Sequence, residues 1–332
     1  MTGNLPTASV VIAAYSSARW GYLREAVESV LAQEVPAQEV LAREVPAQEM
    51  LAQGGLPVEV VVVVDHNPAL LDRACQELPA AVTVIPNAAA KGASGARNTG
   101  VAACRGEVLA FLDDDACASA GWLEALLRHF VDPAVVGVGG RVSPLWALPR
   151  PGWFPPEFDW AVGASYQGMP RTAGPVRNVW SNNMAIRRAA FEAAGGFREE
   201  FGKVGTRSRP EDTDLCLRAA AVSGGTWVYE PAALAGHRVP AERSTIGYFI
   251  RRCFHEGRGK AGLAALDGAG QSTSTERHYA RHVLTHGIVR GLRDTVRGDV
   301  AGLLRSAAIA AGFGVAAAGF AIGLLASLGD TS

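Results

Sequence analysis

The sequence predicts an α/β fold built on a mostly parallel, Rossmann-like sheet flanked by helices. Short apolar runs at Ser9–Ala13, Val58–Val64 and Glu107–Leu112 alternate with segments of helical periodicity. The second of these runs is almost unbroken valine, which is typical of a strand buried on both faces. Strands that alternate with helices favour parallel pairing with right-handed crossovers between them.

Three further segments complete this pattern. Val82–Pro86 is expected to be a strand, and the spacing of apolar residues predicts helices over Leu23–Ala32 and Ser94–Cys104. In open α/β sheets, ligands bind beyond the carboxyl ends of the strands. The polar residues expected at those ends are Tyr15, Ser16, Asp65, Asn87, Asp113, Asp114 and Asp115.

Composition limits the classes of partner and compartment. The formal net charge of the 332 residues is -1, so no overall field attracts a polyanion, and a nucleic-acid partner is not expected. No basic cluster precedes the first apolar run at Ala8–Ala14, so we expect no secretory signal and a cytoplasmic catalytic part. The cysteines are odd in number and never spaced C-x-x-C, which favours reduced thiols over disulfides or zinc. They are Cys75, Cys104, Cys117, Cys216 and Cys253.

Two stretches lie outside the motifs treated below, and the first of them is assigned no chemistry. Residues 31–52 repeat with a period of ten, but units this short cannot form a solenoid, and Pro36 and Pro46 interrupt any helix. A local duplication that lengthens a loop is the preferred interpretation, with a partner-binding segment as the alternative. Residues 143–180 are rich in aromatic residues and proline. They predict irregular structure over the sheet edge, whose rings either anchor the loop or contact a sugar.

Three consecutive aspartates, Asp113 to Asp115, follow the strand that ends at Leu112. Adjacent carboxylates repel one another, so a cation or solvent must neutralise them. In an extended segment the first and third side chains point the same way, so Asp113 and Asp115 can serve one Mg²⁺ or Mn²⁺ site. The alternative is an acidic turn that caps a helix starting near Ala118.

A second acidic cluster opens a predicted helix. Glu211, Asp212 and Asp214 follow Pro210, where negative charge also complements the dipole of a helix. Two acidic clusters in one chain, the first at a strand end, favour a combined metal and general-base site over that structural alternative.

Together these segments resemble the family 2 glycosyltransferases, which are inverting enzymes of the GT-A fold, over residues 8–258. The residues that carry the resemblance, in chain order, are Ser9-Val10-Val11-Ile12 with Tyr15, Val64-Asp65, Asn87, Gly92, Ala96-Arg97-Asn98-Thr99-Gly100, Gly106-Glu107, Phe111-Leu112-Asp113-Asp114-Asp115, Ser181-Asn182-Asn183-Met184-Ala185-Ile186-Arg187-Arg188, Gly195-Gly196-Phe197, Glu211-Asp212 and His237. The Q-x-x-R-W motif of processive members is absent after Asp212, which indicates a single transfer of the bacterial non-processive type.

The resemblance implies a role for each matching position. Asp65 would contact the nucleobase, Asp113 the ribose, and Asp212 would be the catalytic base. Asp113, Asp115 and His237 would form the metal site for Mg²⁺ or Mn²⁺. The remaining residues expected to bind the nucleotide sugar are Tyr15, Arg97, Asn183 and Glu211. Arg97 could add positive charge near the diphosphate or could pair at the surface of its helix.

Two departures from the family pattern lie at the nucleoside end. His66 and Asn67 follow Asp65 where a second aspartate is common, and Ala14 precedes Tyr15 where proline is usual. The resemblance implies a UDP-sugar as the donor, but because of these two departures the motif does not establish which nucleobase is bound. The acceptor is expected to be a glycan, a lipid-linked molecule or a small molecule, linked through a hydroxyl or phosphate.

The resemblance ends near residue 260, so we predict a catalytic domain at 1–260 and a helical membrane-associating extension at 261–332. Residues 1–117 would be the nucleotide-binding half and residues 118–260 the half for acceptor and base. Apolar residues recur every four positions from Leu284 to Leu304, and Ser306–Leu328 carries no charge over roughly 34 Å of helix. Arginines precede this segment, which favours attachment at the cytoplasmic face of the membrane. The alternatives are a hairpin docked on the enzyme, a homodimer contact and a cytoplasmic protein.

Three other functions compete with this interpretation. An NAD-dependent oxidoreductase needs G-x-G-x-x-G after the first strand, where this chain has Ala13-Ala14-Tyr15-Ser16. A non-catalytic membrane-bound binding protein would not need both Asp212 and an intact aspartate triplet. A nucleotidyltransferase also uses paired carboxylates and a metal, but it would release pyrophosphate where a glycosyltransferase releases a nucleoside diphosphate.

Overall fold

The computed structural model describes residues 5–33, 58–204, 207–267 and 279–329. The chain forms two compact units, and each is treated by itself below. The first comprises residues 1–142, 170–201 and 211–236, and the second comprises residues 143–169, 202–210 and 237–332. This division does not follow the predicted boundary at residue 260, because residues 143–169 and the chain after Gly236 cluster with the C-terminal helices. The repeat at 31–52 lies almost wholly outside the described residues.

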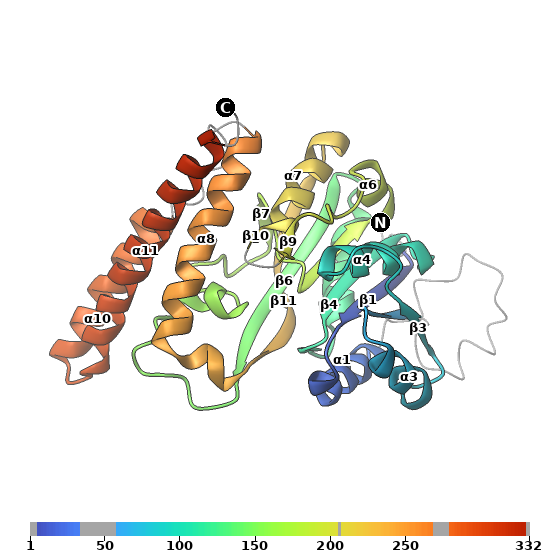
Figure 1. The fold of residues 1–332 in the computed structure, drawn as a ribbon, viewed down its shortest axis with the longest axis horizontal. Helices are drawn as coiled ribbons and strands as arrows, with labels where there is room; N and C mark the ends of the chain where they lie inside the picture. The colour runs from blue at the N-terminus through green and yellow to red at the C-terminus, as the bar shows by residue number, and fades with distance from the viewer. Residues whose placement is uncertain (1–4, 34–57, 205–206, 268–278, 330–332) are drawn as a thin grey trace. The chain divides into compact units, whose positions relative to one another are not determined.

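The first unit is built on one sheet, whose described strands have the order β3-β2-β1-β4-β8-β6-β11-β5, with β7 beside β11 (Figure 1). The parallel part contains β1 (Ala8–Ala14), β2 (Glu59–Val64), β3 (Val82–Pro86) and β4 (Val108–Asp113). The remaining strands are β5 (Ala116–Ala118), β6 (Val135–Trp146), β7 (Gly174–Val176), β8 (Asn183–Arg187) and β11 (Thr226–Val239).

Side chains alternate between the two faces of this sheet, and each face has its own core. Val10 and Ile12 pack with α1 (Trp20–Leu31), α3 (Pro68–Glu77) and α5 (Trp122–Leu127). Val11 and Val61 pack on the other face with α4 (Ala93–Ala103), α6 (Arg188–Ala193) and α7 (Glu211–Ser223). The valine-rich run is therefore buried on both faces, as its composition predicted.

The α/β class with flanking helices is confirmed, but the sheet is more mixed than the sequence pattern indicated. Strand β8 pairs antiparallel with both β4 and β6, and β7 pairs antiparallel with β11. The alternative interpretation of the aspartate triplet, as the cap of a helix starting near Ala118, is wrong: residues 116–118 form β5, and α5 starts only after Gly121, whose φ is 73°. The strands of the antiparallel half are joined by long connections, so local periodicity gave little indication of their direction.

The second unit is mainly helical. It contains α8 (Ile246–Asp267), a π-helical turn at Tyr279–Leu284, α10 (Thr285–Val296) and α11 (Ala301–Gly329). The short strands β9 (Gly202–Val204) and β10 (Arg207–Arg209) form a separate antiparallel pair. The predicted C-terminal stripe does not stay on one helix, because the chain turns at Gly298, where φ is 101°. Leu284 is buried, whereas Val296 and Leu304 are exposed.

The aromatic-rich segment of the second unit forms a packed cluster. Phe154 and Phe158 are fully buried, and their ring centroids lie 5.5 Å and 5.2 Å from that of Phe249 on α8. Trp153 contacts the same ring at 5.6 Å in an edge-to-face arrangement. These rings anchor the segment, which favours the structural alternative over sugar contact for these side chains.

Candidate active site

The polar strand ends predicted to share one edge of the sheet lie together in the first unit. In the parallel register, Ala14 is opposite Val64, and Ala13 is opposite Asp113. Tyr15, Asp65 and the aspartate triplet therefore leave neighbouring strands at the same edge. Tyr15 is exposed, and the guanidinium of Arg19 lies over its ring, 5.0 Å from the centroid.

Asp65 organises the turn that precedes α4. Its carboxylate accepts a hydrogen bond from Nδ2 of Asn87 at 2.7 Å and from the backbone N–H of Gly92 at 3.0 Å. Nδ1 of His66 lies 2.9 Å from the same carboxylate. Gly92 has a φ of 134°, a conformation that a side chain would strain, so the close approach of its N–H depends on glycine. Asp65 is thus a fixed and nearly buried acceptor at the carboxyl end of β2.

Asp113 and Asp115 point toward a common position. Their nearest carboxylate oxygens lie within 4.8 Å of each other, which suits two ligands of one divalent cation. Asp113 is partly exposed and Asp115 is 4% exposed. The carboxylates that the sequence singled out therefore have the spacing and the hard oxygen donors that Mg²⁺ or Mn²⁺ requires.

Asp114 faces a different partner. It is 2% exposed, and its Oδ1 accepts a hydrogen bond from Nη1 of Arg19 at 2.7 Å. Burial raises the pKa of Asp114 to about 6, against the opposing effect of Arg19. Nη1 of Arg19 also lies 3.0 Å from Asp115, so one arginine holds two members of the triplet. Sequence reasoning missed Arg19, because nothing local marks an arginine that pairs with a residue 95 positions away.

Arg97 joins the two acidic clusters. It projects from α4, is 5% exposed, and donates from Nη2 to Asp113 at 2.8 Å. Nη1 of the same side chain lies 3.4 Å from Glu211 at the start of α7. Burial acts to lower the pKa of Arg97, but the carboxylates of Asp113, Glu211 and Asp212 outweigh it and raise the pKa. Arg97 therefore pairs inside the site, and the alternative of surface pairing is wrong.

Asp212 and Asp214, both in the first turn of α7, have different environments. Asp214 is buried and forms ion pairs with Arg218 at 2.6 Å and Arg198 at 3.1 Å. We therefore assign this carboxylate a structural role. Asp212 is partly exposed, and its Oδ1 accepts the backbone N–H of Thr213 at 2.7 Å. Of these two carboxylates, Asp212 is the one with an accessible face.

The side-chain amide of Asn183 is buried and forms its hydrogen bonds within the protein. It is 1% exposed, its Oδ1 accepts from Nε1 of Trp122 at 2.7 Å, and its Nδ2 donates to the carbonyls of Arg141 and Ala233, both at 2.9 Å. Both amide hydrogens are used, so the side chain joins β8 to β6 and β11. This role differs from the predicted contact with the donor, and no sequence pattern identifies Trp122 as the partner of Asn183.

His237 lies on β11, immediately after the last residue of the first unit, and it is 4% exposed. In its own unit the imidazole lies over Gly163, where Cε1 is 3.0 Å from the position that a Cβ would occupy. Gly163 has a φ of 81°, so glycine serves both the backbone conformation and the space for the ring. The five cysteines are free thiols, as expected.

Residues 9–195 match the glycosyl transferase family 2 domain, which is more than half of the chain. The chain belongs to this family. It is therefore a glycosyltransferase that uses nucleotide-sugar donors. A glucosyl-dolichyl phosphate glucuronosyltransferase from Haloferax volcanii is 29% identical over 292 residues, which are 87% of this chain and 86% of the relative. A pre-mycofactocin glycosyltransferase from Mycobacterium tuberculosis is 35% identical over 157 residues, which are 47% of this chain and 32% of that protein.

Two solved structures show the same fold. The mannosyltransferase PcManGT from Pyrobaculum calidifontis, in complex with GDP-Man and Mn²⁺, has a TM-score of 0.54 at 20% identity and covers 98% of this chain and 81% of its own. GalNAc-T7 with UDP, GalNAc and Mn²⁺ has a TM-score of 0.53 at 16% identity, covering 83% of this chain and 54% of its own. The GT-A-like architecture is thereby confirmed, and both of these structures contain Mn²⁺.

Proposed function

We propose that this glycosyltransferase transfers one sugar, with inversion, from a nucleoside diphosphate sugar to an acceptor hydroxyl or phosphate with the help of Mg²⁺ or Mn²⁺. A UDP-sugar is the proposed donor. The observation that carries the proposal is the position of Arg97, which pairs with Asp113 at the end of β4 and with Glu211 beside Asp212. This buried guanidinium links the end of β4, whose carboxylates are proposed for donor binding, to the first turn of α7, which carries the proposed base.

The donor would lie across the carboxyl ends of β1, β2 and β4. Tyr15 and Asp65 are proposed for the nucleoside, because an exposed ring and a fixed carboxylate lie at this end of the site. Asp113 and Asp115 are proposed metal ligands, and His237 is proposed as the third from its place in the family pattern. A bound divalent cation would neutralise the charge that develops on the departing diphosphate. Arg97 would add a fixed positive charge nearby.

Asp212 is the proposed general base. The acceptor hydroxyl is a weak nucleophile, so its proton must leave as its oxygen bonds to the anomeric carbon. Asp212 would take that proton while the bond from the anomeric carbon to the diphosphate breaks and the nucleoside diphosphate departs. Attack from the face opposite the leaving group would invert the anomeric centre. Glu211 is held by Arg97 and would keep the first turn of α7 in position.

A lipid-linked acceptor at the cytoplasmic face of the membrane is the proposed setting. The name of the Haloferax volcanii relative includes a dolichyl phosphate substrate, and that protein matches this chain over most of its length. Among the described helices, one is long and apolar enough to cross a membrane, judged by length and composition: Ala301–Ala326, with a mean hydropathy of 2.1. A catalytic site beside a bilayer would meet such an acceptor in two dimensions.

A donor panel tests the proposal. The purified full-length protein is incubated with UDP-, GDP-, ADP- and dTDP-sugars, with Mn²⁺ or with EDTA, and the released nucleotide is identified by chromatography. We expect metal-dependent release of a nucleoside diphosphate from a UDP-sugar, and an anomeric configuration in the transfer product opposite to that of the donor. Release of pyrophosphate would instead support nucleotidyl transfer, and retained configuration would exclude Asp212 as a base in a single displacement.

A further inference from the structure

Helix α11 is packed closely against α8 within the second unit. A Cβ at Gly319 would overlap the carbonyl oxygen of Phe254, and a Cβ at Gly257 would overlap that of Ala316. At Gly323, a Cβ would lie 2.7 Å from that of Ala261. Because these glycines let the two backbones approach, the G-x-x-x-G pair of α11 serves contact with a helix of the same chain.

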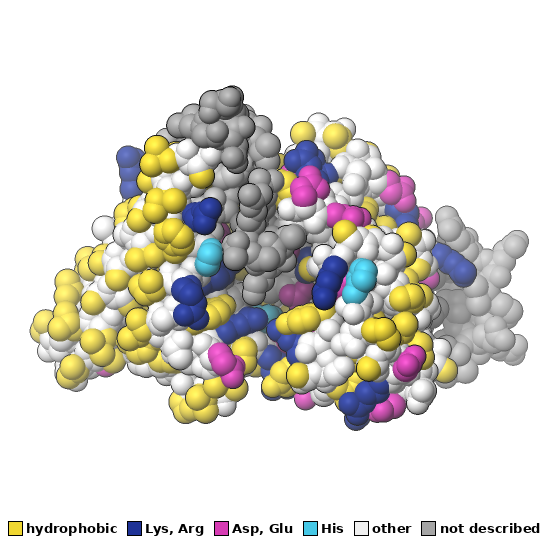
Figure 2. All heavy atoms as spheres, in the orientation of Figure 1, with side chains coloured by type: hydrophobic (Ala, Val, Ile, Leu, Met, Phe, Trp, Pro, Cys, Tyr) yellow, Lys and Arg dark blue, Asp and Glu magenta, His cyan; other side chains and the backbone are white. Residues whose placement is uncertain are grey.

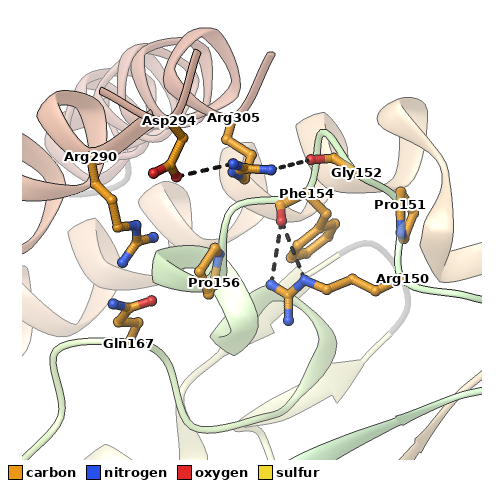
Figure 3. A pocket seen from close by; sticks show the side chains of 9 residues that line it. All are labelled: Arg150, Pro151, Gly152, Phe154, Pro156, Gln167, Arg290, Asp294 and Arg305. Atoms are coloured by element: carbon orange, nitrogen blue, oxygen red, sulfur yellow. Dashed lines mark hydrogen bonds and ion pairs between the residues drawn. The ribbon is translucent and has the colours of Figure 1, made fainter. Parts of the chain in front are cut away.

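Polar contacts tie α10 and the start of α11 to the segment around residue 150, and Figure 3 shows the hydrogen bond from Arg305 to the carbonyl of Gly152. Arg305 donates to the carbonyl of Gly152 at 3.2 Å and pairs with Asp294 at 3.2 Å and Asp299 at 2.6 Å. Arg290 pairs with the buried Glu157 at 2.7 Å. These contacts line a pocket of about 430 Å³. The arginines that line this pocket are paired with carboxylates, so they do not form an anion-binding site. Their contacts hold the neighbouring segments together.

The opposite face of α11 is apolar and uncovered. Only 17% of the apolar window is buried. Figure 2 shows hydrophobic side chains over most of the visible face of the α10–α11 hairpin. The large side chains exposed on α11 are Leu303, Leu304, Phe313, Ile322 and Leu325. A continuous apolar face of this length is unusual on a soluble surface and marks a contact with a partner or a lipid phase.

The neighbouring helix prevents α11 from crossing a bilayer while it stays docked. Along the turns that pack on α11, α8 carries charged residues around its circumference: Arg251, Arg252, Glu256, Arg258 and Lys260. Charged side chains in the middle of a membrane-spanning helix cost about 2.5–3.5 kcal/mol each, so α8 cannot follow α11 into the hydrocarbon. A spanning α11 would have to leave α8 and lose the close contacts at Gly257 and Gly319.

We propose that α11 does not span the membrane but lies in the plane of an anionic bilayer, with one face on α8 and the opposite face in the acyl boundary. This deepens the membrane attachment proposed above and rests on it. Charge complementarity favours a bilayer over a second copy of the chain, because Arg293 and Arg297 are exposed at the end of α10 beside the exposed Val296. Basic side chains beside an apolar helical face are the pattern of interfacial helices.

Vesicle binding tests the surface. Full-length protein is sedimented with vesicles of phosphatidylcholine, with and without phosphatidylglycerol. We expect binding to the anionic vesicles, and Phe313→Asp with Ile322→Asp should lower the partition coefficient by about tenfold or more, because two half-exposed apolar side chains leave the boundary. Val222→Asp, at an exposed apolar position on α7, is the matched control and should bind like the wild type.

A protease-protection experiment distinguishes an α11 that lies in the plane of the membrane from an α11 that spans it. An epitope is added to each end of the chain, and sealed inverted membrane vesicles are treated with protease. In-plane binding exposes both epitopes to digestion, whereas a spanning α11 protects the C-terminal one and overturns the inference. A soluble dimer that Phe313→Asp dissociates, without vesicle binding, would assign the face to a second copy and would also overturn it. Melting curves confirm that the variants fold.

The test of the proposed catalysis is independent of the test of the proposed membrane contact of α11. Donor hydrolysis in solution needs no bilayer, so each vesicle experiment is accompanied by that assay. If the protein hydrolyses donor but does not bind vesicles, only the proposed membrane surface is overturned. If it binds vesicles but does not hydrolyse donor, only the proposed catalysis is overturned.

Discussion

The guanidinium of Arg97 lies 2.8 Å from the carboxylate of Asp113, and its other nitrogen reaches Glu211 at 3.4 Å. These two carboxylates come from β4 and α7, which are far apart in the sequence. The arginine is 5% exposed, so this pairing takes place largely out of water. It makes the geometry of the proposed donor site depend on the position of α7.

Arg97→Met should therefore affect both stability and donor binding. Removing the guanidinium leaves Asp113 and Glu211 facing each other without a cation, which we expect to cost about 1–3 kcal/mol of unfolding free energy. Denaturant titration measures this loss, and calorimetry should show weaker donor binding. Arg24→Met removes an exposed arginine paired with Glu28 on α1 and should change stability by only about 0.5 kcal/mol. Similar effects from both variants would refute a special role for Arg97.

Asp115→Asn should abolish transfer and remove the dependence of donor binding on Mn²⁺ or Mg²⁺. An amide in place of a carboxylate keeps the shape but loses the negative charge that a hard divalent cation needs. Donor affinity is measured with the metal and with EDTA. Asp72→Asn, at an exposed position on α3, is the control and should retain both activity and metal dependence. Full activity of the Asp115 variant in EDTA would exclude the metal site.

Asp212→Asn should leave donor affinity near the wild-type value while the transfer rate falls by roughly 10²–10⁴, the range for losing a general base. The physical reason is that the amide cannot accept the acceptor's proton. Single-turnover rates and donor affinity are measured separately. If binding and rate fell equally, Asp212 would be a structural residue or a metal ligand.

The parts of this site that sequence could predict are those that depend on local order. A valine strand, an aspartate triplet after Leu112 and an acidic helix start are all readable without contacts, and the strand ends do share one edge. The pairing of Arg19 with Asp114 and the bond from Trp122 to Asn183 could not be predicted, because they join residues 95 and 61 positions apart. Such contacts exist only once the sheet has formed.

Asp159 should make stability depend on pH. Burial raises its pKa to about 6, more strongly than the ion pair with Arg150 lowers it. A carboxyl whose folded pKa exceeds its unfolded value of 3.8 binds its proton more tightly in the native state. Its contribution to stability is therefore complete below pH 3.8 and is lost as the pH rises through about 6. Between these values, unfolding free energy should fall with pH more steeply for the wild type than for Asp159→Asn. Equal slopes would contradict the shift.

Alanine substitutions at two glycines of α11 distinguish the contribution of helix packing to stability from that of helix propensity. A Cβ at Gly319 would overlap the carbonyl of Phe254, whereas a Cβ at Gly314 meets nothing within 4 Å. Gly314→Ala should therefore be neutral or stabilising by up to about 1 kcal/mol, the difference in intrinsic helix propensity between the two residues. Gly319→Ala gains the same propensity but forces α11 away from α8, and overpacking of this kind typically costs about 1–3 kcal/mol. Thermal unfolding of the two variants in detergent measures the difference. A stability for Gly319→Ala equal to that of Gly314→Ala would mean that α11 does not rest on α8 in solution, and the inference that it lies in the plane of the membrane would lose its basis.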